Sequence, residues 1–257
     1  MTSPIGSRTL RLVPRRFVSS VLALALLSIV SPAAHPGGSD TAVGTRAVSG
    51  PSSPALAVAK TSKNPCKDGA HSTAGTVWKQ KVRWRFAAST VPDGLSRRAV
   101  LDRLARAAHN IVAGRNTCKL SDQISATERY LGHTTAKPNI SSDGACGATD
   151  GKNVLGFGKL PMEDLALTCW WTVGGHTVES DMLLNSEYGW TVHPASDCED
   201  SWSVEGVATH EWGHVFGIAH VAEATHPLLT MSPGILPCQN SEATLGLGDV
   251  RALRSLY

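Results

Sequence analysis

We expect an α+β fold, because strand-like and helix-like patterns follow one another irregularly along the chain. Residues 78–87 alternate apolar and basic side chains, as in a strand with one buried face, whereas residues 203–216 carry apolar side chains at helical spacing. Hydrophobic residues make up 42% of the 257 positions. This is enough for a sizeable core and excludes disorder over the whole chain.

In the first expected strand, the buried face holds Val82, Trp84 and Phe86, and the basic residues between them face outward. Ser96 is a suitable N-cap for a helix whose apolar positions run from Val100 to Val112, and Gly114 ends it. The arginines of this helix fall mostly off its apolar stripe, which favours a solvated face over a binding patch.

The middle of the domain is expected to be rich in strands and loops. Short strands are predicted at residues 153–157, 165–173 and 181–185. A second helix begins near Ser201 or Ser203, and a last helix spans residues 247–256.

The N-terminal 64 residues differ from the rest in composition. In residues 1–34, four arginines precede a short apolar run and a group of small residues, which predicts a secretory signal peptide cleaved after Ala33 or Ala34. A single membrane anchor is the alternative, but the run is short for spanning a bilayer. Residues 35–64 are rich in Ser, Pro, Gly, Ala and Thr and predict a disordered linker or pro-segment. The compact domain is therefore expected at residues 65–257.

This organisation predicts a secreted, extracellular protein with no stable membrane insertion after the signal is removed. Beyond the leader the chain has 20 basic and 21 acidic residues, so its charge gives no argument for a nucleic-acid partner. Six cysteines follow the leader: Cys66, Cys118, Cys146, Cys169, Cys198 and Cys238. An even number in a secreted chain predicts three disulfides, and their spacing alone does not select the pairing.

One stretch has metal-binding character: HEWGHVFGIAH, residues 210–220. On a helix, His210 and His214 lie one turn apart on one face and can direct two imidazoles at one ion. Gly217 can end the helix with a turn, so that His220 arrives as a third ligand. Three imidazoles and a water form an open zinc site, in which Glu211 can take the proton of the metal-activated water as general base. The alternative is a buried helix with hydrogen-bonded histidines, which is disfavoured because burying three imidazoles and a carboxylate costs free energy.

This stretch resembles the zinc signature of the metzincin peptidases, and LTMSP at residues 229–233 resembles their Met-turn. The closing segment, LGLGDVRALRSLY, is similar to the last helix of the matrixin branch. The resemblance covers about residues 78–257 and implies a matrixin-like peptidase of the secreted bacterial type. It implies a twisted mixed sheet with a backing helix and an active-site helix, and a small C-terminal subdomain with a Met-turn and a terminal helix.

Carried onto this chain, the resemblance implies His210, His214 and His220 as zinc ligands, Glu211 as the base and Met231 as the floor beneath the ion. It also implies an edge strand that binds extended peptide substrates through its backbone. The residues of that strand would be Leu165, Ala166, Leu167 and Thr168.

The chain departs from the family pattern in several places. Residues 143–175 contain no histidine, so we expect one catalytic zinc and no second, structural zinc. Asp143, Asp150 and Asn153 would be the oxygen donors of a calcium site, with a simple turn as the favoured alternative. Position 232 is Ser, where many relatives have Tyr, and the wall of the specificity pocket would be built from residues 232–237.

The cysteine switch of matrixin propeptides is also absent, since the residues around Cys66 match it poorly. We favour a Cys66–Cys118 disulfide, and a Cys198–Cys238 disulfide that ties together the two walls of the cleft. Cys146–Cys169 is then the remaining pair.

The function expected from the resemblance is that of a secreted, monomeric zinc endopeptidase acting on protein or peptide substrates. A catalytically inactive binding module on the same scaffold, and a zinc hydrolase of cell-wall peptides, are the alternatives.

Overall fold

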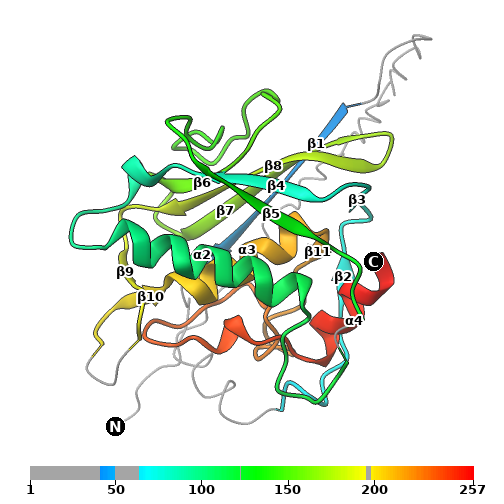
Figure 1. Ribbon diagram of the computed structural model, residues 1–257. Helices are drawn as coiled ribbons and strands as arrows, with labels where there is room; N and C mark the ends of the chain where they lie inside the picture. The colour runs from blue at the N-terminus through cyan, green and yellow to red at the C-terminus, as the bar shows by residue number, and fades with distance from the viewer. Residues whose placement is uncertain (1–40, 50–63, 122, 195–197) are drawn as a thin grey trace, which may run out of the picture. The chain divides into compact units, whose positions relative to one another are not determined.

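The computed structural model describes residues 41–49, 64–121, 123–194 and 198–257. Its centre is a mixed seven-stranded sheet in the order β1-β7-β8-β6-β4-β5, with β3 pairing with β8 (Figure 1). The sheet strands are β1 Thr41–Ser49, β3 Val77–Trp78, β4 Val82–Phe86, β5 Glu128–His133, β6 Asn153–Gly158, β7 Asp164–Val173 and β8 His176–Asn185. Strands β1, β7 and β8 pair antiparallel, and the other pairs in the sheet are parallel.

The helices and smaller strands complete the α+β architecture. The helices are α2 Arg97–Val112, α3 Val204–Val215 and α4 Leu247–Leu256, and the short 3-10 helices are Ala88–Thr90 and Ser241–Ala243. Two further pairs of short strands are β9 Gly189–Thr191 with β10 Ser201–Ser203, and β2 Ser72–Thr73 with β11 Ile218–Ala219. No helix in these described ranges has the length and hydropathy required to cross a bilayer.

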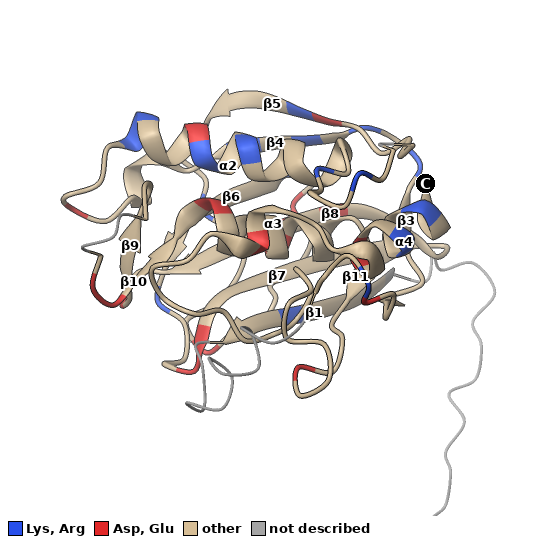
Figure 2. Cartoon of the chain, turned by 90° about the horizontal axis from the view of Figure 1, so that it is seen from below, with Lys and Arg blue, Asp and Glu red and all other residues tan. Residues whose placement is uncertain are grey.

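Helices α2 and α3 lie side by side over one face of the sheet (Figures 1 and 2). Between these helices and the sheet lies the main hydrophobic core, which includes Val82, Trp84 and Phe86 of β4, all fully buried. The Trp84 ring meets Trp212 of α3 edge-on, with 5.7 Å between ring centroids. The helix that bears the histidine motif is therefore fixed against the centre of the sheet.

Both helix predictions near the sheet agree with the structure. The Ser96 hydroxyl accepts from the amide of Ala99 at the start of α2, and the Ser203 hydroxyl accepts from the amide of Gly206 at the start of α3. The last helix also has the predicted bounds. Helix starts are local features, since a side-chain oxygen satisfies an amide only three residues further along.

Polar contacts between α2 and α3 involve Arg103 of α2, while Arg97 and Arg106 are exposed as expected. The carboxylate of Glu205 is buried and accepts from Arg103 at 3.0 Å and from Arg115, beyond the helix, at 3.3 Å. Asn110, also buried, donates to both Glu205 and Thr209. A buried carboxylate must be compensated, so these residues fix the first turns of α3 on α2.

The segment expected to be a disordered linker or pro-segment at residues 35–64 contains a strand. Residues 41–49 form β1, which pairs with β7 over its whole length. Strand formation there depends on pairing with β7, and among residues 42–49 only Val48 is fully buried, so the sequence gives little apolar signal for it. The signal peptide expected at residues 1–34, and the rest of the linker up to residue 63, lie outside the described residues.

The six cysteines form the three favoured disulfides. Cys66 is joined to Cys118, Cys146 to Cys169 and Cys198 to Cys238. The second bond fixes the residue 146 loop to β7, and the third links the segment before β10 to the segment that follows the Met-turn sequence. Cys66 is thus held in a disulfide and is not a free thiol.

Candidate metal centre and active site

Three histidines converge beneath β7. His210 and His214 lie one turn apart on α3 and are both buried. Their Nε2 atoms are 3.1 Å apart, and the Nε2 atom of His220 lies 3.0 Å from each of them. Within the described ranges, this is the only group of three or more His, Cys, Asp or Glu side chains with the geometry to hold an ion.

Gly217 explains how His220 reaches the other two. Its φ of +83° turns the chain out of α3, and a Cβ there would lie 2.2 Å from the carbonyl oxygen of Thr76. Beyond the turn, β11 pairs with β2, and the amide of Val221 donates to the carbonyl of Met231. His220 is therefore positioned by backbone hydrogen bonds before it, between β11 and β2, and after it, between Val221 and Met231.

Hydrogen bonds orient the rings of the first two histidines. The Nδ1 of His210 donates to the carbonyl of Thr230 at 2.7 Å, and the Nδ1 of His214 donates to the carbonyl of Ile218 at 2.9 Å. Since a carbonyl can only accept, the proton of each neutral ring lies on Nδ1 and leaves a lone pair on Nε2.

The electrostatic environment favours the neutral forms of His214 and His220. Burial lowers the pKa of His214 well below its usual value, and the neighbouring His220 and the Arg46 guanidinium lower it further. Burial and Arg46 lower the pKa of His220 to about 4. Neutral imidazoles are the form that binds transition metals.

The residues present fit a zinc ion. Three lone pairs about 3 Å apart repel one another unless a cation lies among them, and this spacing is compatible with one ion about 2.0–2.1 Å from each nitrogen. Carbonyl acceptors on the outer ring nitrogens are also the usual support of metal-bound histidines.

Glu211 lies beside this cluster. It is fully buried, its Oε2 accepts from the hydroxyl of Thr168 at 2.5 Å, and its Oε1 has no hydrogen-bond partner in the part of the chain that the structure describes. Burial raises the pKa of Glu211 to about 8, although the Thr168 bond opposes the shift. A divalent cation nearby would favour the carboxylate. The unpartnered oxygen is available to a water held at the cluster.

The Met-turn residue packs directly against the helix backbone. Met231 is fully buried, and a Cβ at Gly213 would lie 2.3 Å from its sulfur. The amides of Thr230 and Met231 both donate to the carboxylate of Asp249 in α4, which also caps that helix through Gly246. Asp249 thus ties the Met-turn to the last helix, a role that sequence reasoning missed because its partners lie 18 and 19 residues away.

The edge of β7 that was expected to bind substrate is paired with β1. Leu165, Ala166, Leu167 and Thr168 lie in β7 as predicted, but β1 pairs with them. The Thr168 side chain points to Glu211, a contact between residues 43 positions apart with no local sequence signature. Beyond β7, the amide of Ser49 donates to Pro233 and its carbonyl accepts from Ile235, within the expected pocket wall.

The three expected calcium donors have separate structural partners. Asp143 accepts from Ser141 in a turn, Asp150 pairs with Lys152 at 2.8 Å, and Asn153 donates to the carbonyl of Arg83. They form no common cluster among the described residues.

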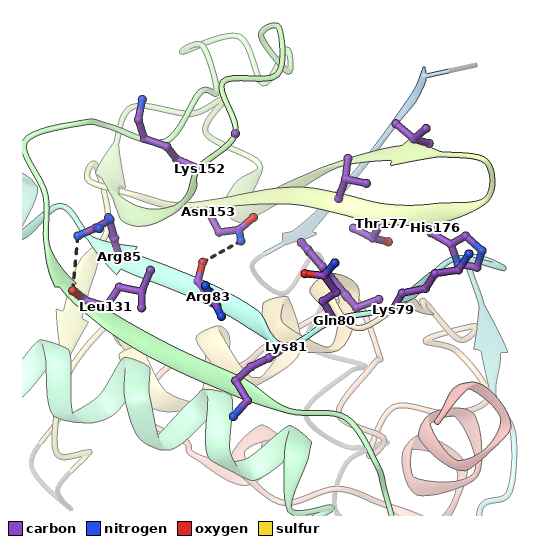
Figure 3. Close-up of a pocket in the computed structure, with 14 residues that line it drawn as sticks. Lys79, Gln80, Lys81, Arg83, Arg85, Leu131, Lys152, Asn153, His176 and Thr177 are labelled. Atoms are coloured by element: carbon purple, nitrogen blue, oxygen red, sulfur yellow. Dashed lines mark hydrogen bonds between the residues drawn. The ribbon is translucent and has the colours of Figure 1, made fainter. Parts of the chain in front are cut away.

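A hollow lies on the face of the sheet away from α2 and α3. It is lined in part by Lys79, Lys81, Arg83, Arg85 and Lys152, the outward-facing side chains around β4 (Figure 3). None of the three clustered histidines lines it, so it is separate from the candidate metal centre.

Comparison with known families agrees with this geometry. The matrixin family model matches residues 163–257, which include β7, all three clustered histidines, Glu211 and Met231. No curated protein matches the chain. The C-terminal part of the chain is therefore matrixin-like, as the motif resemblance predicted, and this family suggests metallopeptidase activity.

Proposed function

We propose that this protein is a secreted, zinc-dependent endopeptidase that hydrolyses extended protein substrates. The single observation that carries the proposal is the cluster of three Nε2 atoms within 3.1 Å of one another, with the buried Glu211 carboxylate beside it. His210, His214 and His220 would hold the ion. Glu211 has the position of a general base, next to the ligands without being one of them.

The chemistry divides between the ion and the chain. When bound, zinc would acidify a water and polarise the substrate carbonyl. Glu211 would take the proton of the attacking water and deliver it to the leaving amine. Thr168 would hold the carboxylate in one orientation through its 2.5 Å bond, and Met231 would close the site from below and exclude water.

The same edge of the sheet would bind substrate. An extended peptide would add to β7 as an antiparallel strand, and the segment at 233–235 would hold the residues that follow the scissile bond. This position is supported by β1, which already makes both sets of backbone contacts. Proteins and peptides in an extended conformation are therefore the expected substrates of a monomeric enzyme.

Three disulfides support an extracellular location, since such bonds persist in oxidising compartments. The predicted signal peptide supports it independently.

Casein hydrolysis by zinc-loaded protein, with and without a chelator, tests the proposal. Glu211→Ala should keep one zinc per chain by metal analysis and lose turnover by roughly 10³-fold or more, because a general base and its water are both affected. His220→Ala should lose the metal as well. A zinc-loaded wild type inactive on casein and gelatin would contradict the proposal. Activity on cell-wall peptides alone would favour that alternative, and zinc binding without any hydrolysis would favour the binding module.

A further inference from the structure

Strand β1 makes a complete set of substrate-like backbone contacts. It runs antiparallel to β7 with Arg46 opposite Thr168, Ala47 opposite Leu167 and Val48 opposite Ala166. The register shifts between Val48 and Ser49, and Ser49 is opposite Asp164 while its backbone also reaches the expected pocket wall. There its amide donates to the Pro233 carbonyl at 2.9 Å, and its carbonyl accepts from the Ile235 amide at 3.1 Å.

The side chains of β1 fit the surfaces that they meet. Val48 is fully buried and belongs to the main core cluster together with Met231 and Ile235. Gly44 lies so close to the Trp170 ring that a Cβ there would be 2.3 Å from it. A larger residue at position 44 would therefore lift the strand off β7.

The register places residues 46–49 across the candidate active site. Thr168, opposite Arg46, donates to the Glu211 carboxylate, so this section of β1 passes the proposed base. Strand β1 also packs against α3, which carries two of the histidines. The peptide bond before Val48 therefore lies between Arg46, which is opposite Thr168, and Ser49, which is bonded to the expected pocket wall.

We propose that β1 is an intramolecular substrate and that the Ala47–Val48 peptide bond is a self-processing site. The proposal rests on the proposed peptidase function. One water is consumed: its oxygen bonds to the carbonyl carbon of Ala47, the C–N bond to Val48 breaks, and the proton passes through Glu211 to the new amine. The segment that ends at Ala47 then leaves β7, whose outer backbone groups become available to other peptides.

Until that cut, the strand blocks the cleft, and it does so without a cysteine. Cys66 is disulfide-bonded, so latency here comes from backbone pairing and the burial of Val48. Because the strand belongs to the same chain, its hydrolysis is unimolecular.

The first experiment follows the N-terminus of the full chain after zinc is added to metal-free protein. N-terminal sequencing and intact mass should reveal a new terminus at Val48, with a rate constant that does not change over a 100-fold range of protein concentration. Casein hydrolysis should rise in step with the cut. A first cut at any other bond, or a full-length chain that hydrolyses casein while residues 41–49 stay intact, overturns the self-processing site but leaves the proposed function standing. A zinc-loaded chain that cuts neither casein nor itself overturns both.

The second experiment measures whether β1 is docked on β7 in a protein that cannot cut it. In Glu211→Ala, hydrogen exchange should show protection of β1 and of the β7 amides that do not point to β8. Adding Gly44→Val should abolish this protection, whereas the matched change Thr45→Val, at an exposed position of the same strand, should preserve it. In the active chain, Gly44→Val should slow the cut at least 10-fold. A β1 that is unprotected in Glu211→Ala overturns the docking of β1.

Discussion

At the scale of single residues, the site depends on how Glu211 is held. One carboxylate oxygen is fixed by Thr168 and the other has no partner among the described residues, so the group is oriented but not saturated. The residue that orients it comes from β7, the strand that the substrate itself would pair with. Orientation of the base and binding of the substrate thus depend on one strand.

We predict that Thr168→Val lowers kcat by about 10- to 100-fold, since a hydrogen bond to a charged group contributes about 1.5–3 kcal/mol. Val has the same shape but cannot donate. Thr168→Ser should keep most of the activity because its hydroxyl can take the same place. Steady-state kinetics of the two variants, with zinc content measured for each, makes the comparison. Equal kcat in both would mean that the Thr168 hydroxyl does not position the base.

The sequence predicts the proposed metal ligands and Glu211 better than it predicts the residues that hold them in position. His210, Glu211 and His214 occupy one helix, and Gly217 brings His220 back, so their spacing alone indicates the site. Thr168 and Asp249 reach it through tertiary contacts from other elements. No local pattern distinguishes them from ordinary strand and helix-cap residues.

At the scale of elements, one buried carboxylate joins β8 to the start of β6. Asp181 is almost fully buried and accepts from the amides of Asn139 at 2.5 Å and Val154 at 2.7 Å. Burial raises the pKa of Asp181 to about 7, with smaller contributions from Glu179 and Asp150, while the two amide bonds oppose the shift.

This raised pKa predicts a pH-dependent stability. Between about pH 4 and pH 7 the unfolded chain releases the Asp181 proton while the folded chain retains it. The stability from this group is therefore complete below the unfolded pKa and is lost as pH rises through the folded pKa. Relative to Asp181→Asn, the wild-type free energy of unfolding should fall over this range, by at most about 1.4 kcal/mol per pH unit. Urea denaturation of both proteins at pH 5, 6, 7 and 8 measures it. A wild-type free energy of unfolding that rises with pH relative to that of Asp181→Asn would contradict this direction.

Helices were easier to predict than strands. α3 and α4 have their caps and apolar spacing within a few residues of sequence, and the structure places them where these patterns indicate. β5 was missed because its half-buried side chains alternate with exposed ones without strong apolar character. β2 and β11 have two residues each, too few for any periodicity, yet their pairing positions His220.

At the scale of the whole molecule, the proposed ion would join parts of the chain that the sheet does not connect. Two ligands lie on α3 and the third lies beyond β11, which is paired with a strand from the beginning of the domain. Bound metal would therefore stabilise the helix, the turn after it and the β2 segment together.

Removing the metal should lower the melting temperature by roughly 10 °C, given about 4 kcal/mol from a ligand at 1,000 times its Kd and about 2–4 °C per kcal/mol for a domain of this size. Differential scanning calorimetry of Glu211→Ala with zinc or with a chelator measures the effect without self-digestion. His220→Ala serves as the control, and its melting temperature should hardly respond to the chelator. An unchanged melting temperature in Glu211→Ala would contradict a structural contribution of the ion.

The indole of Trp212 lies between the two helical histidines in sequence, fully buried and in edge contact with Trp84. Its emission is therefore governed by a fixed, dry environment, and a divalent charge held by the residues two positions away on either side would alter the electric field that it experiences. The native chain thus carries its own optical reporter, so that occupancy of the centre can be followed by fluorescence titration without any attached dye.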